Sequence, residues 1–273
     1  MTRRLGAAIT LAMTLALSSC ATLAPPKADG PRPVTQRREA MILDGVRVEL
    51  HVARPGSEGA PLVIFASGDG GWFGAAIGMF DTIAAAGYPV AGLSSRALLR
   101  AIRQPGHPLS ASRLRESYQE IITASKRAAD LPDSTGVILA GWSRGASISV
   151  IAGAEPPAMP LAGIVAIGLS ADENLNIDLD SDEDTEPGTG GPGGIDTYVL
   201  SRAIPSRVAV IQSSGDGYLP ADRARILFGG ESPSRRFFEV PASNHRFSGG
   251  AVTFRLSLTE ALNWIAIHEG PPQ

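Results

Sequence analysis

The chain of 273 residues has little cysteine, little histidine and little net charge. It contains one cysteine and four histidines, and its formal net charge is only −3. A single cysteine, Cys20, excludes a disulfide within the chain. So small a net charge gives no reason to expect a nucleic-acid partner. The sequence also shows no internal repeat, and its length allows one large domain with a substantial core.

The first twenty residues have the organisation of an export signal. Two arginines precede an apolar stretch over 5–17 that is too short to span a membrane. Leu17-Ser18-Ser19-Cys20 resembles a bacterial lipobox, in which the cysteine is acylated and becomes the new N-terminus. We therefore expect a lipoprotein signal peptide over 1–20 and a lipid anchor at Cys20, with an ordinary signal peptide as the alternative. Ala21, where a sorting aspartate could stand, favours the periplasmic face of the outer membrane over the inner one.

Residues 21–38 are rich in proline and charge and predict an extended tether. From residue 39 to 273, apolar strand-like runs alternate with helical stretches. Such alternation predicts an α/β domain with a mostly parallel sheet covered by helices on both faces. We expect strands near 41–43, 46–52, 62–66, 90–93, 137–140, 164–168, 208–211 and 237–240, and helices near 75–86, 112–129, 146–154, 221–228 and 252–267.

The most informative motif is Gly141-Trp142-Ser143-Arg144-Gly145. An apolar run precedes it and a helical stretch follows it. A serine between glycines on a strand-to-helix turn is typical of the nucleophile elbow of the α/β-hydrolase fold. The glycines leave room for the tight turn, and the helix N-terminus favours a developing anion. Ser143 is therefore the expected nucleophile, although a pattern this short also arises by chance.

The elbow predicts an acid and then a histidine, in loops after later strands. Only His245 and His268 follow Ser143. His268 ends the last expected helix, whereas His245 stands in a polar, glycine-rich loop after a strand, so His245 is the expected base. Asp216 ends another apolar run and is the expected acid, with Asp222 as the fallback. The alternatives are a turn-forming aspartate and a histidine that only packs its loop.

Ser67-Gly68-Asp69-Gly70-Gly71-Trp72 follows an early expected strand. An oxyanion hole takes one N–H from the residue after the nucleophile, here Arg144, and one from such a loop. We expect the amide of Asp69 or of Gly68 to be the second donor. No Lys-Ser/Thr follows the glycines, so a phosphate-binding loop is not supported. Trp72 and Trp142 flank the expected site. They either line an apolar substrate pocket or belong to the core.

The segment 171–196 interrupts the alternation with an acidic stretch and then a glycine-rich one. In an α/β-hydrolase fold an insert here commonly forms a cap over the site, and its carboxylates could attract a cationic headgroup. A solvated loop is the favoured alternative. Asp178-x-Asp180-x-Asp182 lacks the turn glycine of a calcium loop, so we expect no metal ion, and we expect no other cofactor.

The SGDGGW stretch, the elbow at Ser143 and Asn244-His245-Arg246-Phe247 together resemble the bacterial VirJ/AcvB virulence-protein family, from about residue 61 to the C-terminus. The resemblance implies an α/β-hydrolase fold, an exported location and hydrolysis of the aminoacyl ester of lysyl-phosphatidylglycerol. The matching triad positions are Ser143, Asp216 and His245. The acidic insert and the lipobox depart from the family pattern.

Two other functions stay open at the level of sequence: a general carboxylesterase or lipase, and a periplasmic binding or assembly factor that retains a hydrolase fold. Without the insert's eight acids and the leader's two arginines, 19 acidic residues stand against 22 basic ones. A mildly basic body suits an anionic membrane surface. The resemblance to the VirJ/AcvB family implies a membrane phospholipid as the substrate. The sequence leaves the oligomeric state and the amino acid on the headgroup open.

Overall fold

The computed structural model describes residues 35–267 except 56–58, 105 and 177–193. Cys20, the aspartates of the calcium-like pattern and His268 lie outside the described residues. The signal peptide and the lipid anchor therefore remain predictions. Within the described ranges, none of the helices combines the length and the apolar character that a membrane span requires.

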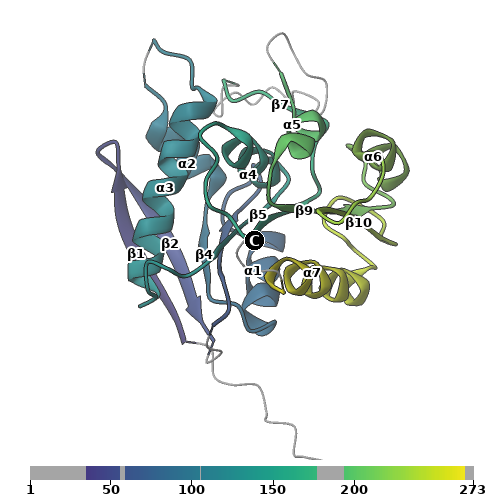
Figure 1. Ribbon diagram of the computed structural model, residues 1–273, viewed down its shortest axis with the longest axis horizontal. Helices are drawn as coiled ribbons and strands as arrows, with labels where there is room; N and C mark the ends of the chain where they lie inside the picture. The colour runs from purple at the N-terminus through teal and green to yellow at the C-terminus, as the bar shows by residue number, and fades with distance from the viewer. Residues whose placement is uncertain (1–34, 56–58, 105, 177–193, 268–273) are drawn as a thin grey trace, which may run out of the picture. The chain divides into compact units, whose positions relative to one another are not determined.

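Eight strands form one sheet in the order β1-β2-β4-β3-β5-β6-β9-β10 (Figure 1). β1 and β2 pair antiparallel, as do β2 and β4, and all other neighbours are parallel. The expected mostly parallel sheet is confirmed. The strands are β1 (Thr35–Leu43), β2 (Val46–Arg54), β3 (Leu62–Ala66), β4 (Val90–Leu93), β5 (Val137–Trp142), β6 (Gly163–Ile167), β9 (Arg207–Ser213) and β10 (Arg235–Val240).

Helices cover both faces of the sheet (Figure 1). One face carries α1 (Ala75–Ala85) and α7 (Ala251–Ala266). The other carries α2 (Ser95–Ile102), α3 (Ala111–Ala128), α4 (Arg144–Ala154), α5 (Thr197–Ala203) and α6 (Ala221–Phe228). Each helix that the alternation predicts is present, and α2 and α5 are additional.

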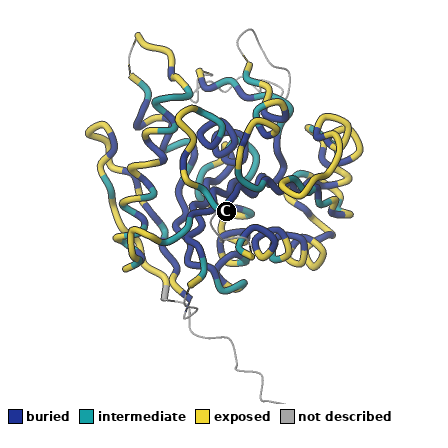
Figure 2. Tube along the Cα trace, viewed as in Figure 1, coloured by how far each residue is buried: buried dark blue, intermediate teal, exposed yellow. Residues whose placement is uncertain are grey.

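The strand β3 shows how the sequence builds these layers. Side chains alternate between the two faces of a strand. Val63 and Phe65 accordingly pack with α1 and α7, while Leu62, Ile64 and Ala66 pack with the helices of the opposite face. Every residue of β3 is buried, so the strand is apolar without interruption, as a strand covered on both faces should be. Figure 2 shows the same burial along the central strands.

The first strand begins earlier than the composition predicts. Residues 35–38, which we assigned to the tether, belong to β1 and pair with β2 as far as Thr35 opposite Arg54. The strand β2 has nine residues and offers a backbone partner to each residue of β1. Residues 36–40 are exposed, as is tolerated on an edge strand, and this exposure explains their polar character.

The described ends of the acidic insert are ordered, contrary to the favoured interpretation of a solvated loop. β7 (Asp172–Glu173) pairs antiparallel with β8 (Ile195–Asp196). Asp196 then caps α5, because its Oδ1 accepts a hydrogen bond from the amide of Val199 at 2.7 Å. The middle of the insert, including residues 177–193, lies outside the described part of the chain.

Candidate active site

Ser143 lies on the sharp turn between β5 and α4. Its φ is 57° and its ψ is −126°, a conformation that costs energy for a residue with a side chain. A Cβ on Gly141 would overlap the backbone of Gly145, and a Cβ on Gly145 would overlap the carbonyl oxygen of Ala66. Both glycines of the motif are therefore required by close backbone approach. The geometry is that of the expected elbow, with the hydroxyl held at the start of a helix.

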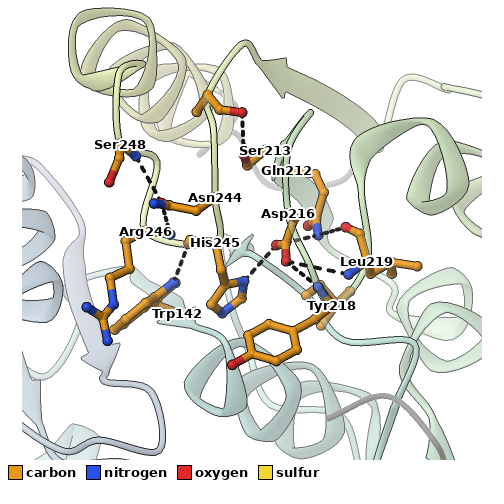
Figure 3. Close-up of polar contacts among 12 residues, drawn as sticks. Trp142, Gln212, Ser213, Asp216, Tyr218, Leu219, Asn244, His245, Arg246 and Ser248 are labelled. Atoms are coloured by element: carbon orange, nitrogen blue, oxygen red, sulfur yellow. Dashed lines mark hydrogen bonds and ion pairs between the residues drawn. The ribbon is translucent and has the colours of Figure 1, made fainter. Parts of the chain in front are cut away.

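Asp216 and His245 are joined by a short hydrogen bond. The distance between His245 Nδ1 and Asp216 Oδ2 is 2.6 Å, and the Asp216 side chain is fully buried. Three further donors hold this carboxylate: the amides of Tyr218 and Leu219 on Oδ1 at 2.9 Å and 3.5 Å, and Nε2 of Gln212 on Oδ2 at 3.2 Å. Asp216 follows β9 and His245 follows β10, and these strands are neighbours in the sheet. The two residues therefore come from adjacent loops (Figure 3).

The imidazole of His245 is packed between two aromatic rings (Figure 3). It stacks on Trp142 with ring centroids 5.4 Å apart, and Tyr218 meets it edge-on at 5.0 Å. Trp142 Nε1 also donates a hydrogen bond to the backbone oxygen of His245 at 3.2 Å. These contacts fix the ring against the residue that immediately precedes Ser143.

Gly168 closes the remaining side of the imidazole. A Cβ at this position would lie only 2.7 Å from His245 Cε1, so any larger residue would displace the ring. His245 Nε2 is buried and has no hydrogen-bond partner among the described residues. A buried polar atom without a partner is uncommon and indicates a site that is completed by another group.

Ser143 and His245 line one cavity of about 520 Å³, together with Trp142, Tyr218 and Arg246. No hydrogen bond joins the Ser143 hydroxyl to Nε2 of His245 in this structure. In unliganded enzymes such bonds are often long and tighten when a substrate binds. The structure thus places Ser143 and His245 on one cavity and the buried Asp216 behind His245, from the loops after β5, β10 and β9.

Gly68 packs directly against the turn of Ser143. A Cβ on Gly68 would lie 3.2 Å from Cβ of Ser143, so the glycine-rich loop after β3 forms the neighbouring wall of the cavity. The carbonyl oxygen of Gly68 accepts hydrogen bonds from the hydroxyl of Ser67 at 3.2 Å, from the hydroxyl of Ser95 at 3.1 Å and from the amide of Gly71 at 3.0 Å. Three donors therefore fix the orientation of this peptide group.

That orientation distinguishes between the two expected donors. In a planar trans peptide, the N–H of Asp69 points opposite to the carbonyl of Gly68. The carbonyl is turned toward Ser67 and Ser95, which are fully buried, whereas Asp69 itself lines the cavity. The amide of Asp69 is therefore better placed than that of Gly68 to donate into the cavity. The amide of Arg144 begins α4, where helical N–H groups have no partner within the helix.

The side chains of Asp69 and Arg144 form an ion pair, with Asp69 Oδ1 2.8 Å from Arg144 Nε. Glu173 of β7 approaches the same nitrogen with Oε1 at 3.2 Å. Burial raises the pKa of Glu173 to about 7, while the charge of Arg144 acts in the opposite direction. Sequence reasoning missed Glu173 because it counted this residue among the solvated acids of the insert.

Trp72 does not line the cavity of Ser143. It packs against Phe65 and Phe80 and stacks on His51, with ring centroids 4.2 Å apart. It lines a separate cavity of about 460 Å³ beside β2 and α1. The pocket role expected for Trp72 is therefore wrong for this cavity, and the alternative of a packing residue fits its position. Trp142, in contrast, lines the cavity as expected.

The fallback acid Asp222 lies in the first turn of α6, where its Oδ1 accepts a hydrogen bond from the amide of Arg223 at 2.7 Å. Asp216 occupies the position beside His245. Gln212 and Gly168 support the site but were not expected. A glutamine directly after the apolar run 208–211 was the available signal for Gln212, whereas nothing in the sequence marks Gly168.

Within the described ranges, no group of three or more His, Cys, Asp or Glu side chains is arranged to hold a metal ion.

Hydrogen bonds around the triad positions involve four further polar residues (Figure 3): Gln212, Ser213, Asn244 and Ser248. The chemical groups at the cavity thus include a hydroxyl and an imidazole with a buried carboxylate behind it.

No protein-family model matches the chain, and no curated protein matches it in sequence. Solved structures are similar in fold. A candidate dienelactone hydrolase from Klebsiella pneumoniae superposes with a TM-score of 0.62 at 13% identity, over 86% of this chain and 99% of that one. Est1E from Butyrivibrio proteoclasticus gives 0.58 at 14% identity, over 84% and 99%. The esterase domain of a Rhodothermus marinus protein gives 0.56 at 15% identity, over 85% and 98%.

These similarities and the strand order show that the chain has the α/β-hydrolase fold. At identities this low they establish the fold and not the activity. Membership of the VirJ/AcvB family stays a prediction from the three motifs.

Proposed function

We propose that this protein is a serine hydrolase that cleaves a carboxylic ester. The observation that carries the proposal is the arrangement of His245. Nδ1 of His245 is hydrogen-bonded to the buried Asp216, and Nε2 has no hydrogen-bond partner in the part of the chain that the structure describes. His245 also shares a cavity with Ser143. A buried acid, an oriented imidazole and a hydroxyl on an elbow are the components of nucleophilic acyl transfer.

The reaction proceeds in two steps. His245 takes the proton of Ser143 through Nε2 as the hydroxyl attacks the ester carbonyl, and Asp216 stabilises the resulting imidazolium. The amides of Asp69 and Arg144 stabilise the negative oxygen of the tetrahedral intermediate. His245 then gives its proton to the departing alcohol. Water attacks the acyl-enzyme by the same route and releases the acid.

Labelling with a fluorophosphonate probe tests this proposal. We expect the purified protein to be labelled at Ser143 and the Ser143→Ala variant to remain unlabelled. Mass spectrometry of the labelled peptide identifies the modified residue. A wild-type protein that folds but does not react would favour the non-catalytic binding or assembly factor.

The finer proposal is that the substrate is the aminoacyl ester of an aminoacylated phospholipid such as lysyl-phosphatidylglycerol. The resemblance of the three motifs to the VirJ/AcvB family supports it. The Asp69 carboxylate on the cavity wall is compatible with a cationic aminoacyl group, and an ammonium beside an ester activates that ester. Release of lysine from the purified lipid, with Ser143→Ala as the control, tests this substrate.

A general carboxylesterase is the second candidate, and the esterases among the structures of similar fold favour it. Competition between a simple acyl ester and lysyl-phosphatidylglycerol distinguishes the two. Preferential turnover of the simple ester contradicts the aminoacyl substrate and leaves the serine hydrolase intact.

We further propose that acylation of Cys20 anchors the protein at the periplasmic face of a bacterial membrane. The lipobox-like residues 17–20 support this location. Two or more acyl chains are needed for stable anchoring, and a processed lipoprotein carries them. Metabolic labelling with an alkyne fatty acid, compared between the wild type and Cys20→Ala, tests the anchor. Equal labelling of the two proteins contradicts it.

A further inference from the structure

We propose that the side chains of Asp69, Arg144 and Glu173 form a clamp that positions the two amides of the oxyanion hole. This inference rests on the proposed serine hydrolase, because only that reaction needs the hole. The reaction itself uses only the backbone amides of Asp69 and Arg144. The proposal adds a positioning role for the side chains of these two residues and of Glu173.

The two amides belong to separate loops. Asp69 stands in the loop after β3, and Arg144 stands at the start of α4, after β5. An oxyanion hole works only when both N–H groups are aimed at one point. The ion pair of 2.8 Å joins the side chains of the same two residues, so it ties one loop directly to the other.

The pair would be weak without a buried partner. The Asp69 side chain is 51% exposed, and an ion pair with one exposed member usually contributes little and leaves the side chains mobile. The Arg144 side chain is only 11% exposed and the Glu173 side chain 6%, at 3.2 Å from each other. The buried Glu173 therefore contacts the Arg144 guanidinium on the interior side, and Asp69 contacts it on the cavity side.

The burial of Glu173 is energetically unfavourable. Burial of a carboxylate disfavours its charged form, and the charges of Asp69 and Asp172 add to this effect. Arg144 and the hydroxyl of Ser147 favour the charged form. A neutral side chain of the same shape would avoid this desolvation penalty. We therefore expect the carboxylate of Glu173 to fix the position of the Arg144 guanidinium rather than to stabilise the fold.

Loss of the clamp should weaken binding of the transition state and not of the ester itself. Removing one oxyanion donor lowers kcat by about 10²–10³. Loosening a donor that is still present should have a smaller effect. On an uncharged acyl ester, which does not need the Asp69 carboxylate for binding, we expect Asp69→Asn to lower kcat by roughly tenfold with little change in KM.

The ionisation of Glu173 provides a sharper test. At pH values above the raised pKa of about 7 the wild-type carboxyl is charged, whereas in Glu173→Gln the residue is neutral at every pH. We would measure the rate constant of fluorophosphonate labelling at Ser143 from pH 5.5 to 9 for both proteins. The ratio of wild-type to variant rates should be near 1 below pH 6 and rise to roughly tenfold above pH 8. A pH dependence that the two proteins share cancels in this ratio.

Matched variants complete the experiment. Glu260→Gln changes an exposed glutamate of α7 and should give a ratio of 1 at every pH. Arg144→Lys keeps the charge but not the geometry of the guanidinium and should show a partial loss of rate. Thermal unfolding establishes that each variant is folded, and Asp69→Asn serves if Glu173→Gln does not fold.

The outcomes separate the two proposals. If the wild type is not labelled at Ser143, the proposed function fails and the clamp fails with it. If the wild type is labelled and Asp69→Asn and Glu173→Gln react at the wild-type rate at every pH, the clamp alone is wrong. A ratio of wild-type to Glu173→Gln rates that lies above 1 but does not change with pH also contradicts the clamp, because a structural defect alone produces that result.

Discussion

Two places in this fold combine a histidine, a tryptophan and a carboxylate, and only one of them has the features of an active site. In the first, His245 stacks on Trp142 and its Nδ1 lies 2.6 Å from Asp216. In the second, His51 stacks on Trp72 with ring planes only 7° apart, and its Nε2 lies 3.1 Å from Glu49. The residue types are the same, and the stack at His51 is the more regular one.

The burial of the acid separates the two places. The side chain of Asp216 is 0% exposed and held by further donors, whereas that of Glu49 is 46% exposed on a strand. His245 comes from a loop beside an elbow serine, while His51 lies within β2. Stacking on tryptophan is thus a packing contact in both places. The feature that points to catalysis is a buried acid on one ring nitrogen, with no partner for the other among the residues that the structure describes.

The largest difference should appear when each histidine is removed. We expect His245→Ala to lower the labelling rate of Ser143 by about 10⁴-fold or more, because the general base is lost. His51→Ala should leave the rate within about threefold, since no reacting group lies beside it in the described structure. Rate measurements with one fluorophosphonate on both variants check this. Comparable losses in both would remove the distinction between the two histidines.

Substitution of Asp216 and of Asp222 should change kcat by very different factors. Asp216→Asn keeps the shape of the side chain but no longer favours the correct tautomer of His245, and we expect a loss in kcat on the order of 10⁴-fold. Asp222→Asn is the matched control and should retain activity, because its carboxylate is exposed and accepts from the amide of Arg223 rather than from His245. Steady-state kinetics on an activated ester compare them. The reverse order of effects would make Asp222 the acid.

A substitution next to the imidazole tests its packing. Gly168→Ala places a methyl group 2.7 Å from His245 Cε1, and a displacement of about 1 Å typically costs about 10²-fold in kcat. Gly168 has φ +59°, so Gly168→Ala also introduces backbone strain, and a control variant must separate that strain from the effect on the imidazole. Gly229→Ala has the same kind of strain at φ +77° and no atom within 4 Å, and it should lower stability without lowering kcat. Equal kcat in the two variants contradicts the close packing of His245.

The smallest effect concerns His51 and pH. Burial is the main cause that lowers the pKa of His51, Arg38 adds to it, and Glu49 opposes both. The unfolded chain therefore binds a proton more readily below pH 6.5, and this histidine costs stability as the pH falls through that range. We expect His51→Phe, which keeps the stack on Trp72, to lose less stability than the wild type between pH 7 and pH 5. Urea unfolding at both pH values measures the difference, and parallel losses refute it.

Several parts of the fold and site were predictable because they depend on local pattern. The β3 run is apolar throughout because both faces of the sheet are covered, and the glycines at 141 and 145 mark a turn that no other residue allows. The order of Ser143, Asp216 and His245 along the chain followed from the same logic. The start of β1 was not predictable, since its polar residues are ordered by pairing with β2 rather than by their own composition.

The sequence by itself determined the layers of this protein and the order of its reactive side chains, because both follow from side-chain periodicity and from turns spanning a few residues. Only the tertiary structure decided that Trp72 packs on His51 outside the cavity of Ser143, why residue 168 has no side chain, and where Glu173 lies. Those relations join loops that are distant in the chain, and the strand order β3-β5-β6-β9-β10 sets them side by side at one edge of the sheet.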